Sequence, residues 1–156
     1  MMALEIERKF RVISDGWKPL AVRSRRLRQA YLAKNEALSL RVRIDGGEAA
    51  VLTIKSADSG MSRQEYEYSI PVADAEELMQ RCEGVVICKT RHIVPLGDVQ
   101  WEVDVFEGEN AGLVIAEVEL DRPDQPLQCP EWLGEEVTED RRFYNAELAQ
   151  RPYSRW

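Results

Sequence analysis

The chain has 156 residues, of which 44% are hydrophobic and 31% are charged. This length is typical of one domain that buries its own core, so we expect a single domain over residues 1–156. The composition excludes an intrinsically disordered chain, and no apolar run approaches the roughly 18 residues that span a bilayer. The formal net charge of −7 argues against a general nucleic-acid-binding protein, although a local basic site can still bind a small polyanion.

Cysteine and histidine are scarce, which limits metal and nucleophilic chemistry. The three cysteines, Cys82, Cys88 and Cys129, are an odd number without the paired spacing of a metal site. We interpret them as free thiols in a reducing compartment. The N-terminal sequence has no signal-peptide pattern, so we expect a cytoplasmic protein. The single histidine, His92, excludes most histidine-based mechanisms.

Short segments in which apolar and polar residues alternate run through the sequence and predict eight β-strands. Their connections suit antiparallel hairpins, with glycine-containing turns at residues 45–47 and 97–98. The predicted strands are residues 4–12, 27–33, 38–44, 49–56, 63–70, 85–94, 99–106 and 113–120.

Only two segments predict helices. Residues 73–82 carry Asp74 and Glu77 at capping-box positions and are followed by Gly84. The second segment is short and follows Asn145. Many antiparallel strands with few helices predict a mainly β (α+β) fold, an eight-stranded antiparallel closed barrel with the helices outside it.

Charged residues share one face of most predicted strands, because residues two apart in a strand point the same way. A solvent-facing sheet also alternates in this manner. Here, however, both members of each pair carry the same sign, whereas a surface built for solubility mixes the signs. Alternation does not decide between such a surface and a barrel interior lined by acids and bases. The pairs are Glu5 and Glu7, Arg41 and Arg43, Glu65 and Glu67, Lys89 and Arg91, Glu102 and Asp104, and Glu117 and Glu119.

The order of these pairs carries a family resemblance. The opening Glu5-Ile6-Glu7-Arg8-Lys9 has the pattern ExExK, and the later pairs follow it in order, with Thr53-Ile54-Lys55 among them. The set resembles the CYTH domain superfamily, the triphosphate tunnel metalloenzymes, and residues 134–145 resemble the C-terminal region of its short bacterial members. The resemblance implies a barrel enclosing a charged tunnel, where triphosphate substrates bind with a divalent metal and are hydrolysed or cyclised.

The basic residues of this set suit the oxygens of a triphosphate, since arginine offers a planar fork and lysine a compact charge. Charge spread over the transferred phosphoryl group needs such cations. The expected substrate-binding residues are Lys9, Arg41, Arg43, Lys55, Arg63, Lys89 and Arg91.

The carboxylates of the set suit a hard cation, Mg²⁺ or Mn²⁺, that bridges them to the phosphates. Eight carboxylates face seven bases, so a metal is needed before a polyanion can bind well. We expect Glu5, Glu7, Glu117 and Glu119 as metal ligands, with Glu65, Glu67 and Asp104 assisting directly or through water.

Lys89 or Lys9 is the expected general base, which predicts activity that rises above neutral pH, and a carboxylate base with an optimum at about pH 6 is the alternative. Tyr31 either reaches toward Lys9 in the tunnel or packs in the barrel wall. The expected reaction is metal-assisted attack of water on inorganic tripolyphosphate, which yields pyrophosphate and phosphate. The alternatives are a class IV adenylyl cyclase, a nucleoside or thiamine triphosphatase, and a non-catalytic polyphosphate- or nucleotide-binding module. No nucleic-acid or membrane partner is expected, and the sequence leaves a homodimer open.

Overall fold

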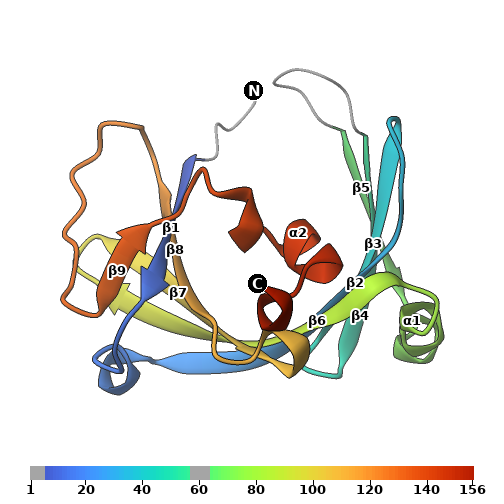
Figure 1. Ribbon diagram of the computed structural model, residues 1–156, viewed down its shortest axis with the longest axis horizontal. Helices are drawn as coiled ribbons and strands as arrows, with labels where there is room; N and C mark the ends of the chain where they lie inside the picture. The colour runs from blue at the N-terminus through green and yellow to red at the C-terminus, as the bar shows by residue number, and fades with distance from the viewer. Residues whose placement is uncertain (1–5, 57–63) are drawn as a thin grey trace.

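The computed structural model describes residues 6–56 and 64–156, and nine antiparallel strands form one sheet in that part of the chain (Figure 1). The strands are β1 (Ile6–Val12), β2 (Arg23–Lys34), β3 (Leu38–Asp45), β4 (Ala49–Ser56), β5 (Glu65–Ile70), β6 (Glu83–Leu96), β7 (Val99–Glu107), β8 (Val114–Leu120) and β9 (Leu133–Glu136). Their order across the sheet is β5-β4-β3-β2-β6-β7-β8-β1-β9.

The predicted mainly β, antiparallel fold is confirmed, but the predicted closure of the barrel is wrong for the described residues. β5 and β9 are the two edges of the sheet. β1 pairs with β8 on one side and with β9 on the other, so it has no free edge for β5. The sheet therefore curves into an open trough with a concave and a convex face (Figure 1). β9 is only four residues long and lacks alternation, so the sequence does not predict it.

All eight predicted strands are present, and four of them, β2, β3, β6 and β7, extend beyond the predicted bounds. β2 begins at Arg23 because its basic residues find acidic partners on neighbouring elements. Arg25 forms an ion pair with Asp45 at 3.0 Å, and Arg26 forms one with Glu107 at 3.0 Å. The predicted starts at residues 4 and 63 lie outside the described residues.

Helices α1 (Val72–Met79) and α2 (Asn145–Gln150) confirm the two predicted helical segments. The predicted capping box at Asp74 and Glu77 is wrong, because α1 begins earlier, after Pro71, and has no side-chain cap. The φ of −60° that proline favours suits a chain that enters a helix. Short 3₁₀ turns cover Lys18–Leu20, Gly108–Asn110, Arg141–Phe143 and Tyr153–Arg155. Within residues 6–56 and 64–156, no helix has the length and apolarity to cross a membrane.

The convex face under α1 is an apolar core. Val42, Ile44 and Ala50 pack against Ala75 and Met79, and all five are at most 5% exposed. Removing this much apolar surface from water is the main force that holds α1 on the sheet.

Tryptophans form the core on the other half of the convex face. Trp101 packs edge-to-face on Trp132, with ring centroids 5.8 Å apart. His92 lies on Trp17 with centroids 4.7 Å apart, so the histidine faces away from the neighbouring charged positions. The tryptophans of this cluster serve packing, as aromatic residues of this size commonly do.

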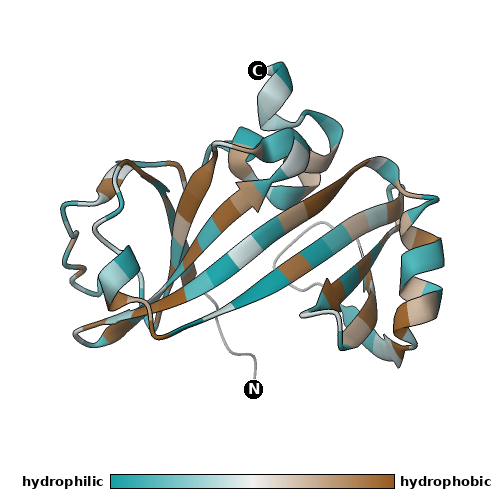
Figure 2. Cartoon of the chain, turned by 90° about the horizontal axis from the view of Figure 1, so that it is seen from below, coloured by the Kyte–Doolittle hydropathy of each residue, from teal (hydrophilic) through white to brown (hydrophobic). Residues whose placement is uncertain are grey.

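The concave face carries the charged residues and becomes apolar where α2 rests on it. Ile87 of β6 and Ile115 of β8 pack with Leu148 and Ala149 of α2. α1 lies outside the trough as predicted, but the prediction that the helices lie outside is wrong for α2, which lies inside it (Figure 1). Polar and apolar residues alternate along the long strands (Figure 2). Alternation in the sequence does not show whether the charged face of the strands points into the trough or toward its outside. In the structure, the charged face points into the trough.

Gly84 at the start of β6 tests the contact between the sheet and α2. Its φ is +74°, and an added Cβ atom would overlap the carbonyl oxygen of Ala149. Gly84→Ala is expected to lower the free energy of unfolding by about 2–4 kcal/mol, because the left-handed conformation and the overlap add. Gly97 has a φ of +61° with open space around it, so Gly97→Ala should cost only about 1–2 kcal/mol. Denaturant unfolding measures the stability of both variants. Equal losses of unfolding free energy would contradict the close approach of Gly84 to the Ala149 carbonyl oxygen.

Candidate active site

The concave face is divided by charge, with basic strands on one side and acidic strands on the other. Strand register places Tyr31 of β2, Arg41 of β3 and Thr53 of β4 side by side. On the other side, Lys9 of β1 lies opposite Glu117 of β8, and Glu7 lies opposite Glu119. β6 and β7 lie between these two groups.

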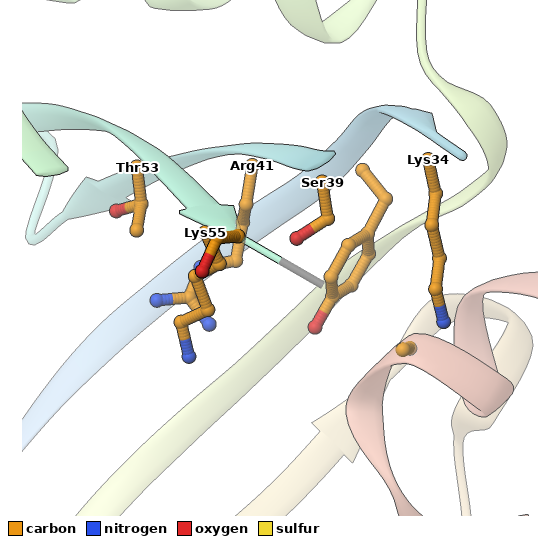
Figure 3. Close-up of a pocket in the computed structure, with 8 residues that line it drawn as sticks. Lys34, Ser39, Arg41, Thr53 and Lys55 are labelled. Atoms are coloured by element: carbon orange, nitrogen blue, oxygen red, sulfur yellow. The ribbon is translucent and has the colours of Figure 1, made fainter. Parts of the chain in front are cut away.

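A cavity of about 260 Å³ opens over the basic strands (Figure 3). Arg41 and Lys55 point into it beside Ser39, and Lys34 approaches from the end of β2 (Figure 3). Burial raises the pKa of Tyr31, although the neighbouring Arg41 works against this shift. The cavity is lined by Tyr31, Lys34, Ser39, Arg41, Thr53, Lys55, Ser56 and Ala146.

Arginine side chains crowd one another next to this cavity. The pKa of Arg43 is lowered first by burial and then by the positive charges of Arg41 and Arg91, with only partial compensation from Asp45. Cations held together in this way repel one another, and an anion between them would relieve the repulsion. The basic side of the trough is therefore suited to bind a polyanion.

A buried ion-pair network lies at the centre of the sheet. Lys89 Nζ is 2.8 Å from an Asp104 oxygen, and Arg91 donates to Asp104 at 2.8 and 2.9 Å. Arg91 also reaches Glu102 at 2.8 Å. Burial alone would raise the pKa of Asp104, but the charge of Lys89 and the hydrogen bonds from Arg91 hold it below its ordinary value. The network fixes both basic groups on the concave face.

The acidic side forms a second cavity, of about 210 Å³, lined in part by Glu7, Glu102, Glu117 and Glu119. The pKa of Glu7 is raised to about 7, first by partial burial and then by the charge of Glu117 and a hydrogen bond with it. Two carboxyl groups this close repel each other when both are charged, so a cation bound beside them would relieve the repulsion.

The start of α2 and the turn before it touch both lysines of the concave face. Lys9 Nζ donates to the Phe143 carbonyl oxygen at 3.4 Å and lies 5.0 Å from the centre of the Tyr144 ring. Lys89 Nζ donates to Asn145 Oδ1, also at 3.4 Å. Both hydrogen bonds are long, so a charged phosphate oxygen is a stronger acceptor for either lysine. The contacts of Phe143 and Tyr144 with Lys9 are not predicted from the sequence, because they depend on where α2 docks.

The structure brings most of the predicted site residues onto one face. Arg41, Arg43 and Lys55 lie on the basic side, whereas Tyr31 lies beside Arg41 and not beside Lys9. The central network contains Lys89, Arg91 and Asp104, and the acidic side contains Glu7, Lys9, Glu117 and Glu119.

Two predicted residues stand apart from these groups, and two others are not described. Glu65 and Glu67 are exposed on the edge strand β5, opposite Lys55 and Thr53, and the open sheet separates them from the other carboxylates. Glu5 and Arg63 lie outside the described residues.

A CYTH domain model matches residues 3–153 of the sequence. The chain belongs to the CYTH domain family. This match confirms the resemblance indicated by the ExExK pattern and by the ordered charged pairs.

Two curated relatives carry the name inorganic triphosphatase. The protein from Acetivibrio thermocellus is 44% identical over 153 residues, with 97% of each chain covered. The protein from Nitrosomonas europaea is 43% identical over 151 residues, with 93% of this chain and 96% of the relative covered.

Two solved structures agree with the fold. The crystal structure of the inorganic triphosphatase NE1496 matches with a TM-score of 0.77 at 40% identity and covers 95% of both chains. The structure of PH1012 from Pyrococcus horikoshii matches with a TM-score of 0.55 at 24% identity, covering 78% of this chain and 80% of its own, and shows the fold alone.

CYTH triphosphatases are metalloenzymes as a class. The hard oxygen donors of Glu7, Glu117 and Glu119 fit a divalent cation, and the raised pKa of Glu7 marks the charge that such a cation would offset. Among the described residues, no group of three acidic, histidine or cysteine side chains is already close enough to hold an ion. Mg²⁺ commonly takes only one or two carboxylates and completes its coordination with water and phosphate, so the donor set is compatible with it.

Asp104→Asn tests the central network. Removing one partner of a buried ion pair leaves the other charges uncompensated, so the variant is expected to lose about 3–5 kcal/mol of unfolding free energy. Asp124→Asn is the matched control, because Asp124 is 85% exposed and should change stability by less than about 0.5 kcal/mol. Urea unfolding at pH 7 measures both, and an Asp104 variant as stable as its control would show that the network is not needed for folding.

The raised pKa of Glu7 predicts a pH-dependent stability. The folded protein binds the proton of the Glu7 carboxyl group more tightly than the unfolded chain does, because the pKa of this group is 4.5 in the unfolded chain. The contribution is fully present below pH 4.5 and is lost as pH rises through about 7. In chelator, Glu7→Gln should therefore be stabilised relative to wild type at pH 8 more than at pH 5.

Burial also lowers the pKa of His92, so the contribution of His92 to stability rises with pH, opposite to that of Glu7. Comparing Glu7→Gln with wild type removes the effect of His92, because both proteins contain it. Glu131→Gln, at an exposed position, is the control and should follow wild type at both pH values. An unchanged difference between Glu7→Gln and wild type from pH 5 to pH 8 would contradict the carboxyl pair.

Proposed function

We propose that this protein is a divalent-metal-dependent inorganic triphosphatase that hydrolyses tripolyphosphate to pyrophosphate and phosphate. The observation that carries the proposal is the division of one concave face into cations suited to phosphate and carboxylates suited to a metal. The two relatives named inorganic triphosphatase, which align over nearly the whole chain, support the same reaction.

The basic side binds the phosphate chain in this proposal. Arg41, Arg43 and Lys55 bind phosphate oxygens around the cavity of Figure 3, and Lys89 and Arg91 continue the binding surface toward the acidic side. Lys9 binds the phosphate nearest the carboxylates, and Arg63 is proposed as a further contact. A chain of three phosphates reaches more of these cations than a chain of two, so binding energy remote from the reacting phosphorus helps to orient it.

The acidic side holds Mg²⁺ or Mn²⁺ in this proposal. Glu7, Glu117 and Glu119 are the proposed ligands, together with Glu5. When bound, the ion supplies charge neutralisation at the phosphates and lowers the pKa of a coordinated water. Glu65 and Glu67 lie on the edge strand β5, apart from these carboxylates, and are not assigned to the metal in this proposal.

Asp104 is assigned a positioning role in preference to direct metal binding. Its carboxylate is 1% exposed and already accepts from Lys89 and Arg91. A metal would have to break these ion pairs to reach it. Asp104 therefore acts on the substrate through the two cations that it orients.

We propose Lys9, in preference to Lys89, as the group that accepts a proton from the attacking water. The Lys89 side chain is 3% exposed and ion-paired with Asp104 at 2.8 Å, so water has little access to its Nζ atom. Lys9 is 14% exposed, and its Nζ is 3.5 Å from Glu117. The Glu7 and Glu117 carboxyl pair is the competing acceptor, and it would favour activity near neutral pH. Tyr31 beside Arg41 is proposed to narrow the substrate path.

The proposal also covers the number of domains, the location and the partners of the protein. The chain acts as one domain on a small triphosphate, in the cytoplasm, which agrees with three free cysteines. Neither a nucleic acid nor a membrane is required by the proposed reaction.

A phosphate-release panel tests the function. Purified protein is incubated with tripolyphosphate, ATP, thiamine triphosphate or pyrophosphate, each with Mg²⁺, Mn²⁺ or chelator. We expect fast hydrolysis of tripolyphosphate, slower hydrolysis of ATP, almost none of pyrophosphate, and no activity in chelator. Glu117→Gln should lose about 100-fold or more of the activity, because loss of an outer-shell partner alone commonly costs 10- to 100-fold. Glu131→Gln should behave as wild type.

Three outcomes would contradict parts of the proposal. Full activity in chelator would exclude the metal. Preference for ATP, with cyclic AMP as the main product, would assign the protein to the adenylyl cyclases. Binding of tripolyphosphate without turnover under any condition would indicate a binding module. A rate that rises well above pH 8 supports a lysine base, whereas a maximum near neutrality supports the carboxyl pair.

A further inference from the structure

Gln29 of β2 has a buried amide group without a partner. The residue is 3% exposed, and its amide nitrogen makes no hydrogen bond within the described residues. An amide donor left unpaired in the interior is costly, so native proteins rarely keep one without a reason.

The position of Gln29 in the sheet indicates that reason. Gln29 is paired with Arg43 on β3 and with Ile87 on β6. Lys89 lies two residues along β6 from Ile87, on the same face. The amide therefore points to the concave face, between an arginine of the basic side and the lysine of the central network.

The electrostatic surroundings favour an anion as the missing partner. Arg41 and Arg91 both lower the pKa of Arg43, which shows that positive charge accumulates here. The Nε atom of Arg41 is also buried without a hydrogen-bond partner. Both buried donors lie beside crowded cations and lack an acceptor, and phosphate oxygens are acceptors that suit either of them.

Other unpaired donors in the described chain do not share these surroundings. The indole nitrogens of Trp101 and Trp132 are also unpaired, but they lie in the apolar cluster on the convex side. Gln29 is thus distinguished by its place next to charged groups of the site.

We propose that Gln29 is a phosphate-positioning residue, whose amide nitrogen donates to a substrate oxygen held between Arg43 and Lys89. This inference rests on the proposed function and adds a neutral donor to the cations of the basic side. A neutral amide orients the phosphate without adding to the repulsion among the arginines.

Access to this position involves the C-terminal segment. Ile87, the neighbour of Gln29 on β6, is covered by Leu148 and Ala149 of α2. Lys89 donates to Asn145 at a long 3.4 Å. The incoming phosphate oxygen would replace the Asn145 oxygen on Lys89 and, in the same movement, accept from the Gln29 amide.

Gln29→Met is the decisive variant, because methionine keeps the length of the side chain and removes the donor. Without substrate, the variant should be at least as stable as wild type, since an unpaired buried polar group is gone. With tripolyphosphate, kcat/KM should fall about 10- to 100-fold, the usual value of a hydrogen bond to a charged acceptor. Gln29→Glu should fall further, because it places a negative charge against the phosphate.

Binding is measured separately from turnover with imidotriphosphate, a hydrolysis-resistant analogue of tripolyphosphate. Saturating analogue should raise the melting temperature of wild type more than that of Gln29→Met. Gln80→Leu is the control: Gln80 is exposed at the end of α1 on the convex side, and the variant should match wild type in both assays.

The outcomes separate this inference from the proposed function. Hydrolysis of tripolyphosphate by wild type, with unchanged kcat/KM and analogue binding in Gln29→Met, overturns the role of Gln29 and leaves the function intact. Loss of stability in Gln29→Met with unchanged analogue binding indicates a packing role and also overturns it. If wild type does not hydrolyse tripolyphosphate but analogue binding still depends on Gln29, the proposed function fails and the phosphate contact stands.

Discussion

One buried carboxylate organises the charged face of this protein. Asp104 is 1% exposed and holds Lys89 and Arg91 in place at the centre of the sheet. Without Asp104, Lys89 and Arg91, which are two residues apart on the same face of β6, would repel each other in a region of low dielectric constant. With it, they stay fixed and face the trough. The separation of cations from carboxylates across the concave face depends on this neutralised centre.

The C-terminal region determines the shape of the trough in which these charges lie. β9 occupies the edge of β1 that a closed barrel would use, so the sheet stays open between β5 and β9. The chain then turns inward, and residues 143–146 contact Lys9, Lys89 and the basic cavity. The same segment thus keeps the sheet open and covers part of the concave face.

Stability and function compete on this face. Glu7 is partly buried beside the like charge of Glu117, Arg43 is crowded by like charges, and Gln29 keeps an unpaired donor. Each arrangement weakens the free protein and would be relieved by a metal ion or a phosphate. The apolar packing of the convex face supplies the stability that permits them. This pattern is what a binding site for a metal and a polyanion requires.

The sequence by itself determined the strands and the residues that share a face, because alternation with a period of two is a local property of the chain. It also determined the family, through ExExK and the ordered pairs. Tertiary structure alone decided that the charged face points inward, that β9 leaves the barrel open, that Tyr31 lies by Arg41, and that Asp104 binds two cations. These features depend on register between distant strands and on the docking of α2, which no local pattern encodes.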